Sequence, residues 1–186
     1  MNQSTLAENS QTATEDAVGG TGTDAALLRS RAVTITLGAV TAILMRSPEH
    51  RDATLRDLEA LVMPPLGLDQ VAIAEARDAK TGAVAPVAMA LWALVSDEVD
   101  RRLADPTLER PRLTPADWNG GTVPWIIAVA GQKTAAARLL EQLVKTRFTA
   151  RPPKIRLTRK DGTIAVGIVE TGSQHAHRHE GPDGPA

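Results

Sequence analysis

The stretch that decides the fold is Val84–Val95, which reads VAPVAMALWALV. An apolar run of this length is typical of a strand that is covered on both faces. Residues 70–77 precede it with a looser alternation of apolar and polar side chains, and Lys80-Thr81-Gly82 supplies a turn between the two segments. The pattern therefore predicts an antiparallel hairpin whose second strand is buried.

Helices and further strands are predicted on both sides of this hairpin. An apolar stripe at helical spacing, ended by Ser47-Pro48, consists of Val33, Leu37, Val40 and Leu44. The other predicted helices are 54–62, stopped at Pro64-Pro65, a helix capped by Ser96 that runs to Ala104, and the amphipathic segment 134–148. The other predicted strands are 123–130, 155–159 and 163–169, the last two joined at Asp161-Gly162. This order, ααββαβαββ, predicts an α/β (α+β) fold with a mixed, largely antiparallel sheet flanked by helices.

The two ends of the chain differ in composition from the part between them. Residues 1–24 and 171–186 carry few large apolar side chains, so they cannot bury enough apolar surface to offset the entropy of ordering. We expect both ends to be disordered tails. Between these tails, residues 25–170 of the 186-residue chain are predicted to form a single compact domain. The C-terminal tail holds most of the histidines.

The composition excludes several classes of function. Aromatic residues make up only 2% of the chain and the net charge is −1, which argues against a base-stacking surface and against nucleic acid as a partner. The absence of cysteine excludes disulfides, thiol catalysis and cysteine-ligated zinc, and it fits a reducing compartment. Neither a signal-peptide pattern nor an apolar stretch longer than 33–45 is visible, so we expect a cytoplasmic protein without stable membrane insertion.

Histidine is the main candidate for proton transfer. His175, His177 and His179 alternate in the C-terminal tail, where they could chelate a divalent metal, although a flexible tail that binds metal only by accident is the favoured interpretation. We therefore assign no metal site. His50 is the only histidine in the predicted domain, and its ordinary pKa of about 6.5 suits a general base. On composition alone it is a surface-loop histidine.

Four short segments, taken in order, carry a family pattern. They are Ser47-Pro48-Glu49-His50 after the first helix, PVAMALWALVS from Pro86 to Ser96, Asp117-Trp118-Asn119-Gly120-Gly121, and Trp125-Ile126-Ile127. Together they use every tryptophan in the chain. In this order and spacing, over residues 33–148, they resemble the RTX toxin-activating lysine acyltransferases, the C-component of haemolysin-type operons.

The resemblance implies a fold similar to GCN5-type N-acetyltransferases and a defined reaction. Such enzymes transfer a fatty acyl group from acyl carrier protein to an internal lysine of an RTX-type protoxin. The donor substrate is acyl–acyl carrier protein, no cofactor is bound, and a homodimer is a family expectation. His50 falls on the catalytic histidine and Ser47 on a supporting motif serine, and the residues that fall on motif positions near the substrate are Trp92, Trp118, Gly120 and Trp125. A lysine amine, with a pKa of about 10.4, needs such a base before it can attack a thioester.

One motif position departs from the family. The second catalytic residue of the family, an aspartate, follows the motif tryptophan by three positions, where this chain has Ala128. Three interpretations remain open. Asp52 or Asp117 could supply the missing carboxylate, His50 could work slowly alone, or the chain could be a catalytically degenerate homologue that binds acyl carrier protein or protoxin without acylating.

Positive charge gathers late in the chain. Between Lys133 and Lys160 many lysines and arginines face a single acid, Glu141. This suits the docking of an acidic partner such as acyl carrier protein, because charge complementarity raises association rates. The alternative is a solvated helix face and a protected strand edge. The docking candidates are Lys133, Arg138, Lys145 and Arg147.

Overall fold

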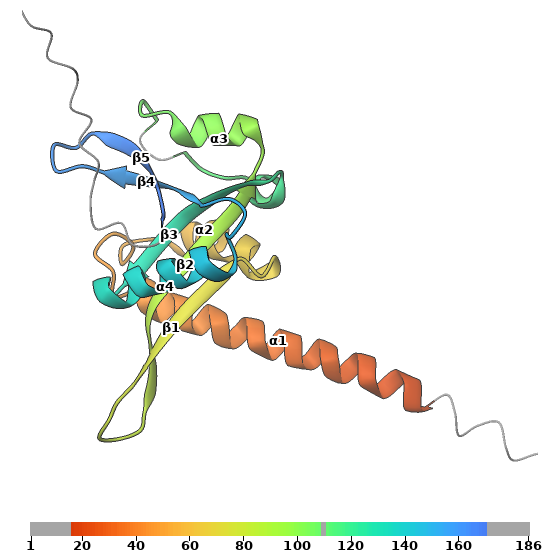
Figure 1. The fold of residues 1–186 in the computed structure, drawn as a ribbon. Helices are drawn as coiled ribbons and strands as arrows, with labels where there is room; N and C mark the ends of the chain where they lie inside the picture. The colour runs from red at the N-terminus through yellow and green to blue at the C-terminus, as the bar shows by residue number, and fades with distance from the viewer. Residues whose placement is uncertain (1–15, 109–110, 171–186) are drawn as a thin grey trace, which may run out of the picture. The chain divides into compact units, whose positions relative to one another are not determined.

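The computed structural model describes residues 16–108 and 111–170, with side chains from residue 24 onward (Figure 1). By its internal contacts the chain divides between Gly38 and Ala39, inside helix α1 (Asp16–Leu44). The first unit, where described, is the helix up to Gly38. This helix begins within the segment 1–24 that the sequence predicts to be disordered, and the remaining predicted tail residues, 1–15 and 171–186, lie outside the described residues.

The apolar part of helix α1 is longer than the segment 33–45 identified from the sequence. Within the described residues one helical stretch, Asp24–Leu44, is long and apolar enough to cross a membrane by length and composition. The core helix of a soluble protein and a signal sequence meet the same criteria, so this finding is weak evidence for insertion.

The second unit contains a five-stranded sheet in the order β1-β2-β3-β4-β5. Its strands are β1 (Val71–Arg77), β2 (Val84–Val95), β3 (Val123–Gly131), β4 (Lys154–Thr158) and β5 (Ile164–Ile168). All neighbours are antiparallel except β3 and β4, which run parallel. The predicted hairpins, the buried strand β2 and the largely antiparallel sheet are thus confirmed.

The helices of this unit depart from the sequence prediction in two places. They are α2 (Leu55–Gly67), α3 (Asp97–Ala104), the short 3₁₀ helix η1 (Pro115–Asn119) and α4 (Lys133–Thr146). The predicted stop at Pro64-Pro65 is wrong, because α2 continues through both prolines. Val62, Pro65 and Leu66 are buried on one face of α2, and this burial offsets the backbone hydrogen bonds that proline cannot make. Helix η1 was not predicted.

The two faces of the sheet carry different elements. Trp92 and Ile126 are paired across β2 and β3. They pack in one apolar cluster with Leu139 and Leu143 of α4 and with Phe148, which follows that helix. Leu91 and its partner Ala128 point to the opposite face, because strand side chains alternate. A bulge between these two pairs leaves one extra residue, Ile127, in β3. Within the described residues, four α-helices and a five-stranded mixed sheet give the mixed α/β architecture expected, consistent with an acetyltransferase-like fold.

Candidate active site

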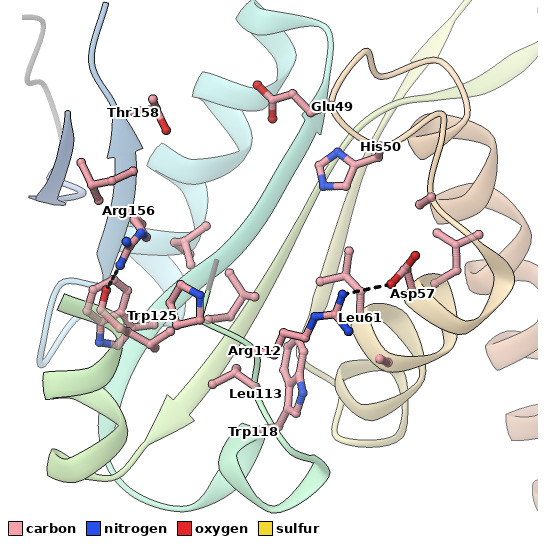
Figure 2. Close-up of a pocket in the computed structure, with 18 of the residues that line it drawn as sticks. Glu49, His50, Asp57, Leu61, Arg112, Leu113, Trp118, Trp125, Arg156 and Thr158 are labelled. Carbon is pink, nitrogen blue, oxygen red and sulfur yellow. Dashed lines mark hydrogen bonds and ion pairs between the residues drawn. The ribbon is translucent and has the colours of Figure 1, made fainter. Parts of the chain in front are cut away.

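A groove of about 1010 Å³ lies on the face of the sheet opposite α4. Its floor includes Trp125 of β3, Arg156 and Thr158 of β4, and Ile164 of β5. Ile155, which directly precedes Arg156 in β4, packs on the other face of the sheet against the cluster with α4, as the alternation of strand side chains requires. Residues of α2 and of the turn after α1 form one wall, and residues following α3 form another (Figure 2). The volume is at the upper end of the range for small-molecule sites.

His50 lies in the turn that follows α1 and lines this groove. The carbonyl oxygen of Ser47 accepts hydrogen bonds from the amides of His50 (3.1 Å) and Arg51 (2.9 Å), which fixes the turn. The Ser47 Oγ lies 3.4 Å from His50 Nδ1, and the imidazole is half-buried. The structure therefore brings together the two residues that the sequence places in one motif. Because Nδ1 is the nitrogen that contacts Ser47, Nε2 is on the side of the imidazole away from Ser47.

Trp125 is held rigidly in the floor of the groove. Its indole Nε1 donates to Asp100 Oδ1 (2.7 Å), and Lys154 Nζ donates to the same oxygen (2.8 Å) and lies 5.9 Å from the Trp125 ring centroid. Burial would raise the pKa of the Asp100 carboxyl, but the hydrogen bonds from Lys154 and Trp125 outweigh it and leave this pKa below its ordinary value. Asp100 thus stays ionised and anchors both neighbours.

The other residues predicted near the substrate are not all at the groove. Trp118 lies in η1, is 1% exposed and lines the groove. Trp92 lies on the α4 face, where its ring meets Phe148 edge-to-face at a centroid distance of 5.9 Å. Gly120 ends η1 and is not among the groove residues. The motif tryptophans therefore divide between the two faces of the sheet.

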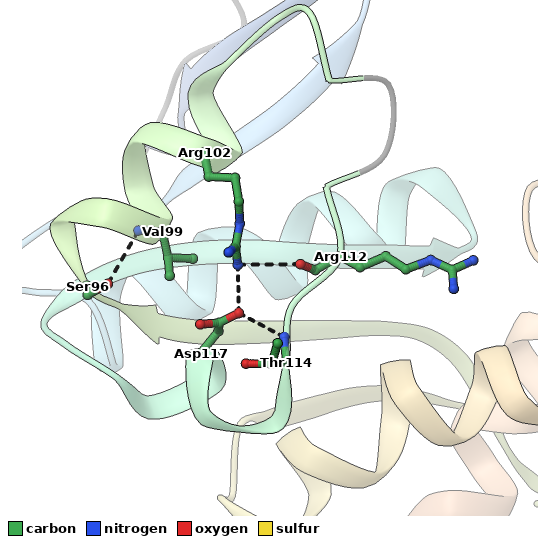
Figure 3. Close-up of polar contacts among 6 residues, drawn as sticks. All are labelled: Ser96, Val99, Arg102, Arg112, Thr114 and Asp117. Atoms are coloured by element: carbon green, nitrogen blue, oxygen red, sulfur yellow. Dashed lines mark hydrogen bonds and ion pairs between the residues drawn. The ribbon is translucent and has the colours of Figure 1, made fainter.

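Asp117, one of the two proposed substitute carboxylates, is committed to a local network (Figure 3). Its Oδ2 accepts from Arg102 Nη2 (2.6 Å) and from the Thr114 amide (2.8 Å), so it joins α3 to the start of η1. It does not line the groove. Arg102 also donates to the Arg112 carbonyl (3.4 Å), which fixes the backbone of the groove wall. Asp117 therefore lies outside the groove and stabilises the segment that forms its wall.

The Asp117 network predicts a pH-dependent loss of stability. Burial raises the pKa of this carboxyl, but the hydrogen bonds from Thr114 and Arg102 prevail and the pKa lies below its ordinary value of 3.8. A lowered folded-state pKa stabilises the fold above the ordinary value, and this contribution is lost as pH falls through the folded-state pKa. We expect Asp117→Asn to lower the free energy of unfolding by about 2 kcal/mol at pH 7. Urea unfolding at pH 7 and pH 3 checks this, and a difference from wild type that is equally large at both values contradicts it.

Asp52, the other proposed carboxylate, does line the groove. Its side chain is 91% exposed and approaches the Arg51 guanidinium at 3.8 Å. Of the two carboxylates it is thus the one on the same side of the sheet as His50. Ala128 is buried on β3 and shares a face with Leu91, so a side chain at this position points to the groove side of the sheet.

Two further groove residues form an ion pair that sequence reasoning missed. Asp57 completes the capping box of α2, with its Oδ2 accepting from the amide of the N-cap residue Thr54 (3.1 Å), and its Oδ1 lies 3.5 Å from Arg112 Nη2. The pair joins α2 to the segment before η1 (Figure 2). The spacing of Thr54 and Asp57 is that of a capping box, which signals the helix start but not the groove.

The predicted docking cations all belong to α4 or follow it directly. Lys145 pairs with Glu141 (2.6 Å), and Arg147 pairs with Asp69 (3.0 Å) and lies 5.8 Å from the Trp92 ring centroid. Lys133 and Arg138 are exposed. Because α4 covers the Trp92 face, these cations lie on the opposite side of the sheet from the groove.

Metal binding has no support in the part of the chain that the structure describes. The described side chains, those of residues 24–108 and 111–170, contain no group of three or more histidines, aspartates or glutamates that could hold a metal ion. The alternating histidines His175, His177 and His179 lie outside the described residues.

The comparisons with known proteins identify the family of the chain. The model of a family described as "HlyC: RTX toxin acyltransferase family" matches residues 30–169, which is most of the chain and includes the His50 turn and all five strands. A search of curated proteins finds no match. The chain therefore belongs to the RTX toxin acyltransferase family, whose activity is acyl transfer in RTX toxin activation.

Proposed function

We propose that this protein transfers a fatty acyl group from acyl carrier protein to the ε-amine of an internal lysine in an RTX-type protoxin, in the cytoplasm and without a bound cofactor. The observation that carries the proposal is His50 at the edge of a groove of about 1010 Å³. The apolar side chains in this groove, among them Leu61, Leu113 and Ile127, suit a fatty acyl chain. A base beside such a chain is the arrangement that acyl transfer to an amine needs.

His50 is the proposed general base. With hydrogen on Nδ1, the ring donates to Ser47 Oγ, and Nε2 is then the basic nitrogen of the imidazole. Nε2 takes a proton from the lysine ammonium, and the neutral amine attacks the thioester carbonyl. The C–N bond forms as the C–S bond breaks, the attacking nitrogen gives its second proton to the departing thiolate of the carrier's prosthetic group, and the proton held by His50 is released to solvent. Atoms and charge balance without a metal or a redox partner.

A second candidate function is binding of acyl carrier protein or protoxin without acylation. The specific observation in its favour is Ala128, which places a methyl group where the family motif has its catalytic aspartate. Asp117 does not compensate, because it is bonded to Arg102 and Thr114 outside the groove. Asp52 is the remaining carboxylate from the sequence analysis that could support His50 from the groove side.

Co-expression with an RTX-type protoxin separates the two functions. We expect intact-mass analysis of the protoxin to show an added fatty acyl group, which is absent when the modified lysine is changed to arginine. The same cells without this protein give the background. An unmodified protoxin, together with carrier binding by the purified protein, contradicts the enzyme and supports the binding function.

A further inference from the structure

We infer that acyl carrier protein docks on the turn between β4 and β5, through Arg159 and Lys160, and not on α4. This inference rests on the proposed function and names the surface that serves it. The turn lies on the groove side of the molecule, whereas α4 covers the other face of the sheet.

The first step of the argument is the position of the turn. Thr158 is the last residue of β4, Ile164 is the first residue of β5, and the two are paired across the hairpin. Both line the groove. In Figure 2 Thr158 lies, with Glu49 and His50, toward the end of the groove away from Trp118. The five residues between Thr158 and Ile164 therefore continue directly from the groove edge.

The second step is the structure of the turn itself. The Arg159 amide donates to the Thr163 carbonyl (2.8 Å), and the Gly162 amide donates to the Arg159 carbonyl (3.0 Å). Gly162 adopts φ 83°, a conformation that favours glycine. Asp161 accepts from the amide (2.9 Å) and hydroxyl (2.7 Å) of Thr163. The hydrogen bonds fix the backbone and engage the only carboxylate of the turn.

The third step is the charge that the turn presents. Arg159 and Lys160 are exposed, and neither forms an ion pair with a carboxylate of residues 24–108 or 111–170, whose side chains the structure describes. On the α4 side, Lys145 and Arg147 already have carboxylate partners in Glu141 and Asp69, so two of the four docking candidates there are neutralised. An acidic partner thus meets unpaired cations at the turn. Rim charges of this kind mainly raise association rates.

The last step is the reach of the substrate. The acyl chain is tethered to its carrier by one flexible arm, and the thioester must come to His50 on the groove side. A carrier docked on α4 would lie across the sheet from His50, behind the packed cluster of Trp92, Leu139 and Phe148. A carrier docked on the β4–β5 turn lies beside the groove edge at Thr158. The turn therefore fits the donor better than the helix does.

Paired charge reversals test the inference. The turn variant is R159E with K160E, and the matched control on α4 is K133E with R138E, which makes the same change in net charge. We expect the turn variant to raise the Kd for acyl–acyl carrier protein about tenfold at low salt, with a weaker salt dependence than wild type. Carrier-dependent transfer should slow by the same factor, while transfer from an acyl-pantetheine thioester stays at the wild-type rate. The α4 variant should keep carrier binding within twofold of wild type.

Two results would contradict the docking inference, and a third would contradict the proposed function. Weaker carrier binding by the α4 variant with an unchanged turn variant contradicts the inference and leaves the function intact. Unchanged binding by both variants also contradicts it. If wild-type protein transfers no acyl group from either donor, the proposed function fails, and the binding measurements alone still decide the docking surface. Thermal unfolding of each variant shows that a loss of binding is not a loss of fold.

Discussion

Replacing His50 with alanine is expected to lower acyl transfer to the protoxin by about 10²–10⁴-fold, which is the usual contribution of a general base. The lysine amine remains protonated near neutral pH unless a base takes its proton, and His50 is the histidine that lines the groove. Initial rates measured by intact mass, with purified protein and acyl–acyl carrier protein, give the effect. Carrier binding should be unchanged, because His50 is not part of the proposed docking turn.

Two controls accompany this replacement. Ser47→Ala removes the contact to His50 Nδ1 at 3.4 Å, and we expect it to cost about fivefold, the effect of one neutral hydrogen bond. His177→Ala removes a histidine of the C-terminal tail, for which we expect no change in rate. Acylation by H50A at the wild-type rate would show that the proposed base is wrong although the reaction class stands.

Replacing Gly121 with alanine is expected to destabilise the fold by about 3 kcal/mol, since overpacking against fixed backbone costs about this much. A Cβ atom at this position would lie 2.3 Å from the Val95 carbonyl oxygen and 2.7 Å from Ser96 Cα. The Gly121 amide also donates to the Leu94 carbonyl (3.0 Å), so the two segments cannot separate without losing this bond. Thermal unfolding should show a fall in Tm of about 6–12 °C.

Gly120→Ala is the matched control for this stability prediction. A Cβ atom there would meet the Ala116 carbonyl oxygen at 3.1 Å, a tight contact that a small shift relieves. We expect its effect to be less than about 1 kcal/mol. Equal loss of stability in the two variants would contradict the view that the close approach of Gly121 to β2 explains the second glycine of this motif.

The strands were predictable because their signals are local. The apolar run of β2 and the Asp161-Gly162 turn each need only neighbouring residues to be interpreted, and the structure confirms both. The end of α2 was not predictable in this way. Proline weakens a helix locally, but here the burial of Pro65 and Leu66 against the rest of the unit decides the outcome.

Only those contacts of the candidate site that lie within one sequence motif were predictable. Ser47 and His50 are three residues apart in one turn, so their proximity follows from the sequence. The ion pair of Asp57 and Arg112 joins residues 55 positions apart, and no local pattern brings them together. The division of the tryptophans between the two faces depends on strand register. A motif match cannot distinguish a groove residue such as Trp125 from a core residue such as Trp92.

This division of the tryptophans has an optical consequence. The chain has three tryptophans and no tyrosine, so its near-ultraviolet emission comes almost entirely from three indoles. Trp118 and Trp125 line the groove, and Trp92 lies on the other side of the sheet. The molecule thus carries two natural fluorophores at the groove and one internal reference, and we expect a ligand in the groove to change the emission of the first two without any attached label.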